Sequence, residues 1–137
     1  MKDYYNDDRS KIVIYPVAMT TANANGAGID LLTYRKCRLT VLAGASGALL
    51  GASNLATIRF MESSDNSSFT AIADTDLLGG NNTEVIDANA EGNNCVQRSY
   101  IGVKRYVTVR IEPTGTIAVP WCAVAELGSP LHIPMAG

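Results

Sequence analysis

Apolar and polar residues alternate in several short runs of this chain, and turn-forming residues separate one run from the next. In residues 37–43 every second side chain is apolar or small. Residues 105–112 repeat the pattern and place Val107, Val109 and Ile111 on one face. A period of two is typical of a half-buried β-strand, so we expect these three residues in a hydrophobic core.

Other extended runs complete the predicted secondary structure. They predict strands over residues 11–15, 28–32, 56–62, 69–73, 83–87, 95–101 and 117–127. We expect residues 56–62 and 69–73 to form a hairpin across a turn rich in Ser, Asp and Asn. We also expect residues 95–101 to pair with residues 105–112.

Proline positions and chain length set the limits of the fold. Pro16 is expected to end the first strand, and Pro120 to place the last strand at a sheet edge or to bend it. A chain of 137 residues has the size of one domain, and about eight or nine short strands without a long helix are typical of a β-sandwich or jelly roll. We therefore predict an all-β single domain over residues 11–127, with extended arms over residues 1–10 and 128–137.

Charge and composition exclude several functional classes. Lys and Arg total 11 and Asp and Glu total 13, and the resulting net charge of −2 does not favour nucleic-acid binding. The single histidine, His132, lacks the partners of a His-based triad or a multi-His metal site, so we expect no enzyme, no metal and no other cofactor. No apolar run reaches the roughly 18 residues of a membrane span, and the polar N-terminus does not resemble a secretory signal.

The three cysteines are far apart in the sequence and odd in number. We expect Cys37, Cys95 and Cys122 to be free thiols of a protein made in a reducing compartment, two of them packed as small hydrophobic residues. One disulfide with one free cysteine stays open as an alternative, because sequence spacing does not set connectivity.

The acidic loops are the first candidates for a binding site. Residues 65–67 and 74–76 contain carboxylates and other oxygen groups of the kind that binds Ca²⁺. Their spacing matches no EF-hand loop, whose ligands lie at alternate positions and end with a distal Glu. Solvated turns, in which Asp and Asn cap their own backbone, are the favoured interpretation.

A basic window is the second candidate, together with the two ends of the chain. Residues 92–111 contain Arg98, Lys104 and Arg105 and no acid. We expect their charges to meet acidic loops of the same or a neighbouring subunit. The predicted contact residues at the ends are Tyr4, Tyr5, Leu131, His132, Ile133 and Met135.

Three segments of the chain carry a resemblance to a known group of proteins. They are Glu62-Ser63-Ser64-Asp65-Asn66-Ser67-Ser68-Phe69-Thr70, Asp74-Thr75-Asp76-Leu77-Leu78-Gly79 and Tyr100-Ile101-Gly102-Val103-Lys104-Arg105-Tyr106-Val107-Thr108-Val109. The region that contains them, residues 56–127, resembles small virion proteins of tailed phages and prophages, some of which coat the capsid as decoration or cement proteins. These motifs are structural, so no functional residue is transferred from that group.

The resemblance implies a virion protein that binds the outer capsid surface and stabilises the head shell. Its partner is expected to be the major capsid protein, and a homodimer or homotrimer is expected because shells are symmetric. It would be made in the bacterial host cytoplasm and located on the capsid exterior.

Two alternatives stay open. One is a component of the tail or of the head–tail connector. The other is a carbohydrate-binding jelly-roll module, because the step from Gly102 to Val107 is also similar to strands of discoidin-like lectin domains. Trp121 would be the first sugar-binding candidate, but it lies in an apolar strand and we expect it in the core.

Overall fold

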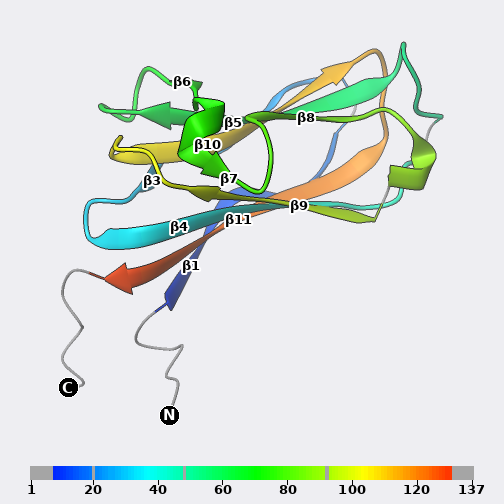
Figure 1. The fold of residues 1–137 in the computed structure, drawn as a ribbon. Coiled ribbons are helices and arrows are strands. Elements are labelled where there is room, and N and C mark those ends of the chain that lie inside the picture. Colours follow the sequence, from blue (N-terminus) through cyan, green and yellow to red (C-terminus); the bar gives the residue numbers. More distant parts are fainter. Residues whose placement is uncertain (1–7, 20, 48, 92, 131–137) are drawn as a thin grey trace.

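The structure is a computed structural model that describes residues 8–19, 21–47, 49–91 and 93–130. These residues form two antiparallel β-sheets packed face to face, with two short 3-10 helices in the connections (Figure 1). The prediction of an all-β sandwich is confirmed.

The first sheet contains both described ends of the chain and has the strand order β1-β11-β4-β9-β7. Its strands are β1 (Asp8–Met19), β11 (Val119–Pro130), β4 (Tyr34–Ala43), β9 (Asn94–Tyr100) and β7 (Leu77–Leu78).

The second sheet is built around the pair β10–β5. On one side β10 pairs with β2 and β3, and on the other β5 pairs with β6 and β8. Its strands are β2 (Ala24–Asn25), β3 (Ile29–Asp30), β10 (Tyr106–Thr114), β5 (Leu55–Ser63), β6 (Thr70–Ala71) and β8 (Thr83–Ile86). The helices are η1 (Asp74–Asp76), before β7, and η2 (Asn89–Glu91), before β9.

The longer strands follow the jelly-roll order. For this comparison β2 and β3 count as one strand, the short β6 and β7 are left out, and the remaining strands are numbered one to eight along the chain. The sheet with β1, β11, β4 and β9 then has the order 1-8-3-6, and the sheet with β2/β3, β10, β5 and β8 has the order 2-7-4-5. This is the double-sheet arrangement of a jelly roll, in which most connections pass from one sheet to the other.

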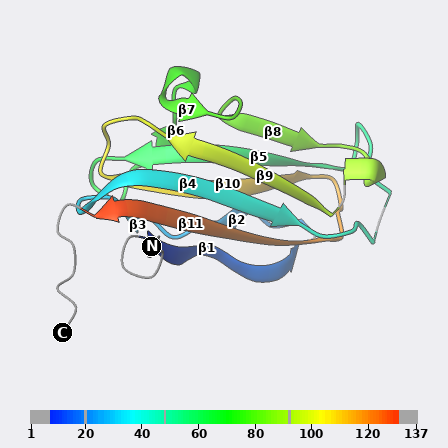
Figure 2. The same ribbon diagram turned by 60° about the horizontal axis from the view of Figure 1, so that its bottom comes forward.

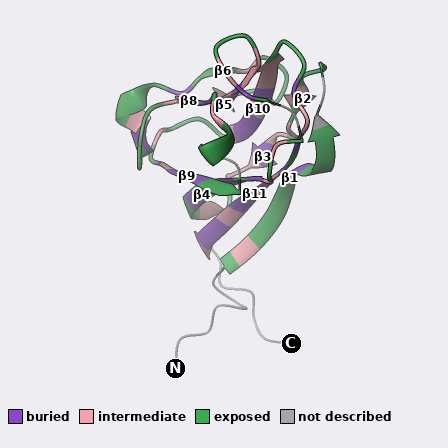
Figure 3. Ribbon diagram, turned by 90° about the vertical axis from the view of Figure 1, so that its right-hand side faces the viewer, coloured by how far each residue is buried: buried purple, intermediate pink, exposed green. Residues whose placement is uncertain are grey.

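The core lies between the two sheets, where the alternating pattern predicted it. Val107, Val109 and Ile111 of β10 are fully buried, as are Leu39 of β4 and Trp121 of β11. The predictions for β10 and for Trp121 are therefore confirmed. Figure 3 shows the consequence along the chain: the central strands carry buried residues, whereas the edge strand β1 is mostly exposed.

Strand β1 runs through Pro16, so the prediction that the first strand ends there is wrong. The strand lies at a sheet edge, β11 is its one strand partner among the described residues, and its register shifts between Ile14 and Val17. An irregular edge strand accepts proline because no second neighbouring strand needs the N–H donor that proline lacks.

Strand β11 is central, which corrects the expectation raised by Pro120. It lies between β1 and β4. Pro120 is only the second residue of the strand, and the ladder with β4 begins one residue later, at Trp121 opposite Ala43. A proline at the start of a strand is tolerated because the ladder on that side has not yet begun.

Residues 95–101 and 105–112 do not pair, contrary to prediction. Strand β9 pairs with β4 and β7 in the first sheet, and β10 pairs with β5 in the second. Alternation predicts which face a strand buries but not its neighbour, and here the connection crosses between sheets. The other predicted pairing is confirmed, since β5 and β6 form a hairpin.

Parts of the two predicted arms belong to the first sheet. Strand β1 begins at Asp8 and β11 ends at Pro130, so residues 8–10 and 128–130 belong to the first sheet. The predicted contact residues that lie outside the described part of the chain are Tyr4, Tyr5, Leu131, His132, Ile133 and Met135.

Candidate functional site

One end of the sandwich has a hollow of about 460 Å³ lined by cationic and apolar side chains. It lies between the turn that joins β3 to β4 and the loop that joins β9 to β10. We call it the basic apolar hollow and define it by Leu32, Arg35, Lys36, Ile101, Val103 and Lys104. Three of these are large exposed apolar residues, and Val103 is 96% exposed. A group of exposed apolar side chains with a polar rim is typical of a protein contact site.

Three cations, Arg35, Lys36 and Lys104, give this hollow its positive charge. No acidic residue is among those that line it. Arg35, Lys36 and Lys104 form no ion pair with any residue in the described ranges. The hollow therefore favours a partner that brings negative charge together with apolar groups.

Arg105, at the edge of the hollow, is engaged by Asp30 of β3. Its Nε donates to Asp30 Oδ1 at 2.9 Å and its Nη2 to Oδ2 at 2.7 Å. The hydrogen bond from Arg105 is the main reason that the pKa of Asp30 falls to about 2. The Leu31 amide also donates to the Arg105 carbonyl at 2.8 Å. These bonds tie the turn to the loop and confirm that this arginine meets an acid of its own subunit.

The Tyr100 side chain contacts the same loop through its hydroxyl group. Its hydroxyl donates to Glu62 Oε2 at 2.6 Å and accepts from the Lys104 amide at 2.9 Å. Burial, together with the hydrogen bond to the Glu62 carboxylate, raises the pKa of Tyr100 well above its usual range. Gly102 passes so close that a Cβ there would lie 2.6 Å from the Tyr100 hydroxyl oxygen. These contacts anchor the loop at Gly102 and Lys104.

The described ends of the chain lie beside the hollow. Strand β11 ends at Pro130, which is paired with Tyr34, a lining residue. Strand β1 begins at Asp8 opposite Gly128, at the same end of the sheet (Figure 1).

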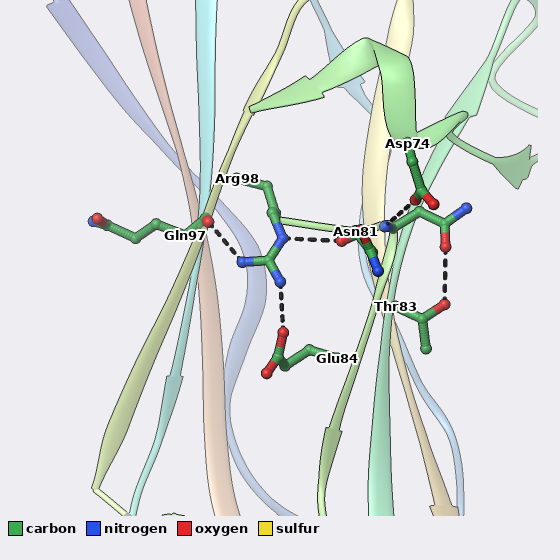
Figure 4. A network of polar contacts seen from close by, with 7 residues as sticks. Asp74, Asn81, Thr83, Glu84, Gln97 and Arg98 are labelled. Carbon is green, nitrogen blue, oxygen red and sulfur yellow. Dashed lines mark hydrogen bonds and ion pairs between the residues drawn. The ribbon is translucent and has the colours of Figure 1, made fainter. Parts of the chain in front are cut away.

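Arg98 is not available for a partner, which corrects its prediction as a contact residue. Its side chain is only 7% exposed and lies in the polar network of Figure 4. The guanidinium donates to the Asn81 carbonyl and the Gln97 carbonyl, each at 2.9 Å, and forms an ion pair with Glu84. The Nε, Nη1 and Nη2 atoms of this guanidinium therefore all bind groups of the same chain.

This network joins the two sheets. Arg98 belongs to β9 of the first sheet, whereas Glu84 and Phe60 belong to β8 and β5 of the second. The guanidinium carbon lies 5.5 Å from the centre of the Phe60 ring, within cation–π range. Gly80 has a φ of +146° and lies against the Arg98 guanidinium. A Cβ at this position would lie 2.5 Å from Arg98 Cζ, so glycine is required there. The role of Arg98 is structural.

The acidic loops are capped turns. Asp65 Oδ1 accepts from the Ser67 and Ser68 amides, each at 2.9 Å, and these bonds help to lower the pKa of Asp65 to about 2. Asp74 accepts from the Asn82 amide at 2.7 Å. Across the ranges that the structure describes, no three His, Cys, Asp or Glu side chains are grouped to hold a metal ion.

The three cysteines form no disulfide with one another, and only one of them is fully buried. Burial raises the pKa of the Cys37 thiol to about 12. Cys95 is exposed and Cys122 is partly exposed, although two packed cysteines were expected. In the described residues, no helix has the length and apolar character that crossing a membrane requires.

The residues that the sequence did not single out for this site are Leu32, Arg35, Lys36, Ile101 and Val103. They come from two segments far apart in the chain, the β3–β4 turn with the start of β4 and the β9–β10 loop, and only the crossing between sheets brings them together. The one local signal is that each segment joins apolar and basic residues. Lys104 and Arg105 were predicted and do lie at this end.

No family model and no curated protein matches this chain. A solved structure from Bacillus endospore appendages, a novel family of disulfide-linked pili, aligns with 95% of this chain and 97% of that chain, at 14% identity and a TM-score of 0.45. A likeness at this level carries no inference about function.

Proposed function

We propose that this protein is a structural virion protein that attaches to the outer surface of a capsid, with the major capsid protein as its partner. The observation that supports the proposal is the basic apolar hollow at one end of a rigid β-sandwich. The resemblance to phage decoration proteins supplies the class of partner.

The hollow suits attachment because its contact groups are already ordered. Burial of an exposed large apolar side chain contributes about 1.5–3 kcal/mol, and Leu32, Ile101 and Val103 are all exposed. The Asp30–Arg105 pair and Tyr100 hold the surrounding loops, so little conformational entropy is lost on binding. On a shell with many copies, moderate contacts of this kind add up to firm attachment.

The test is cosedimentation of the purified protein with assembled capsid shells of the phage or prophage that encodes it. We expect binding to assembled shells and none to free capsid subunits. Val103→Asp should weaken shell binding at least about tenfold, because it places a carboxylate at the apolar contact. Val85→Asp is the matched control, since Val85 is 40% exposed on β8, away from the hollow.

Three outcomes would overturn the proposal or part of it. Absence of wild-type protein from the shell pellet would remove capsid attachment. Micrographs of labelled virions with copies on the tail would replace the head location by the alternative of a tail or connector component. Equal binding by Val103→Asp and wild type would remove the hollow as the contact surface.

A further inference from the structure

Two cysteines and a leucine form one row across the outer face of the first sheet. Leu42 of β4 is paired with Cys122 of β11 on one side and with Cys95 of β9 on the other. Residues paired in register point to the same side of a sheet, and successive residues point to opposite sides. Val41 and Ala43 are buried in the core, so Leu42 and both thiols face outward, and Leu42 is 42% exposed.

The two outer thiols cannot bond to each other within one chain. They lie two strand spacings apart, about 9.6 Å, whereas the Cα atoms of a disulfide are at most about 7 Å apart. Cys37 is no alternative partner, because it is buried on the inner face. Both outer thiols are therefore left for chemistry with another molecule.

We infer that a second copy of this chain docks on this face, with a twofold axis along β4, so that Cys95 of each copy lies against Cys122 of the other. The two thiols lie at equal distances on either side of β4. A rotation of 180° about an axis parallel to β4, between the two faces, therefore exchanges their positions and places Leu42 on its counterpart. Figure 2 shows the strands of this face, β1, β11, β4 and β9, side by side.

The shape of the sheet is compatible with this axis. The twist of a β-sheet makes its face a saddle, because successive strands tilt in opposite senses on either side of the central strand. A twofold rotation along the central strand carries such a saddle onto itself. Two copies related in this way stay in contact along the strands and do not diverge.

The charges on the face agree with the same axis. Arg38 of β4 is paired in register with Glu126 of β11, and the two side chains form an ion pair. The rotation brings Glu126 of the second copy to the β9 side of Arg38. The two arginines near the axis then have a carboxylate on either side, so the charges in this row are balanced.

The size of the face indicates that the association depends on the thiols. The axis places three long strands, β11, β4 and β9, opposite strands of the second copy. They are about 14 Å wide, and the ten residues of β4 extend about 33 Å, which corresponds to about 480 Å² per copy. Stable interfaces bury about 800 Å² per partner, so contact alone is weak. Facing sheets usually pack about 10 Å apart. The two copies must therefore approach more closely along this row for the disulfides to form, and these bonds would then hold the contact.

The chemistry needs a disulfide oxidant such as glutathione disulfide. A thiolate attacks one sulfur of the oxidant and releases a glutathione thiolate, and the facing thiolate then displaces the second glutathione. For each bridge, two protein thiols lose two protons and two electrons, and one glutathione disulfide becomes two glutathione molecules. Excess reduced thiol reverses the reaction.

The test treats the full chain with glutathione disulfide, followed by non-reducing gel electrophoresis and mass mapping of the bridges. We expect a closed dimer with two bridges, each between Cys95 and Cys122. Cys95→Ser alone and Cys122→Ser alone should give no dimer, whereas an equimolar mixture of the two variants should form a dimer with one bridge. Cys37→Ser is the matched control and should behave as wild type.

Leu42→Asp supplies a second variant that keeps all three cysteines. It should form the dimer at least about tenfold more slowly than the wild type, because two carboxylates would meet at the axis. The inference is overturned if the wild type stays monomeric, forms a ladder of higher oligomers, or shows bridges between like cysteines. Cross-linking of either single variant by itself overturns it as well. The outer face is separate from the basic apolar hollow, so these results are independent of shell binding.

Discussion

Arg98 should contribute more to stability than an arginine in an exposed ion pair, and Arg98→Met tests this. Methionine fills much of the same space but cannot donate a hydrogen bond. The substitution leaves the Asn81 and Gln97 carbonyls without this donor and removes the ion pair with Glu84 that links the two sheets. The contact with the Phe60 ring becomes purely apolar.

The expected loss in the free energy of unfolding is about 3 kcal/mol. A hydrogen bond from a charged donor contributes about 1.5–3 kcal/mol, and two carbonyls lose one each. The Glu84 side chain is 40% exposed and regains water, so it adds little, and methionine packing offsets part of the loss. Arg105→Met is the comparison, because its ion pair with Asp30 is about two-fifths exposed on both sides and should contribute only about 0–1 kcal/mol.

The assay is urea unfolding followed by the fluorescence of Trp121, the single tryptophan, which is buried and should report loss of the core. The same loss corresponds to a fall of about 10 °C in Tm for a domain of this size. Equal losses of unfolding free energy for Arg98→Met and Arg105→Met would refute the reasoning. They would show that burial does not increase the contribution of the Arg98 network to stability.

Two further predictions concern pH and the loop at the hollow. The carboxyl pKa of Asp30 and that of Asp65 are lowered from 3.8 to about 2, so the stability that each contributes is complete above about pH 3.8 and is lost as the pH falls toward 2. The double variant Asp30→Asn, Asp65→Asn should therefore show a flatter decline of unfolding free energy in urea titrations across that range, and an unchanged slope would count against these two groups. Tyr100→Phe removes the hydroxyl between Glu62 and the Lys104 amide and should cost about 1–2 kcal/mol. Hydrogen exchange at the Lys104 amide should accelerate in this variant, and an unaltered rate would show that the bond does not hold the loop.

The strands and their buried faces could be predicted because side-chain direction repeats every two residues along a strand. That local rule placed Val107, Val109 and Ile111 in the core, and the apolar character of its strand did the same for Trp121. The same rule says nothing of the neighbouring strand, and the expected pairing of residues 95–101 with 105–112 failed for that reason.

Proline shows where local rules depend on context. Proline lacks an N–H wherever it lies, but the cost depends on whether a neighbouring strand needs that donor. Pro16 lies on an irregular edge strand, and Pro120 lies before the ladder with β4 begins, so both strands continue past them.

The candidate site divides in the same way. Lys104 and Arg105 stand out in the sequence as basic residues near an expected turn, but Arg98 stands out equally and is buried. The burial of Arg98 follows from Glu84 and Phe60, which belong to the opposite sheet.

The sequence alone predicts an all-β domain of alternating strands with low net charge. Strand periodicity depends on residues close together in the chain, and net charge depends only on composition. The partners of each strand, the basic apolar hollow and the row of Cys95, Leu42 and Cys122 arise only when the chain crosses between two sheets. Such contacts join residues far apart in sequence, and their free energies come from burial and pairing in space, which no local pattern contains.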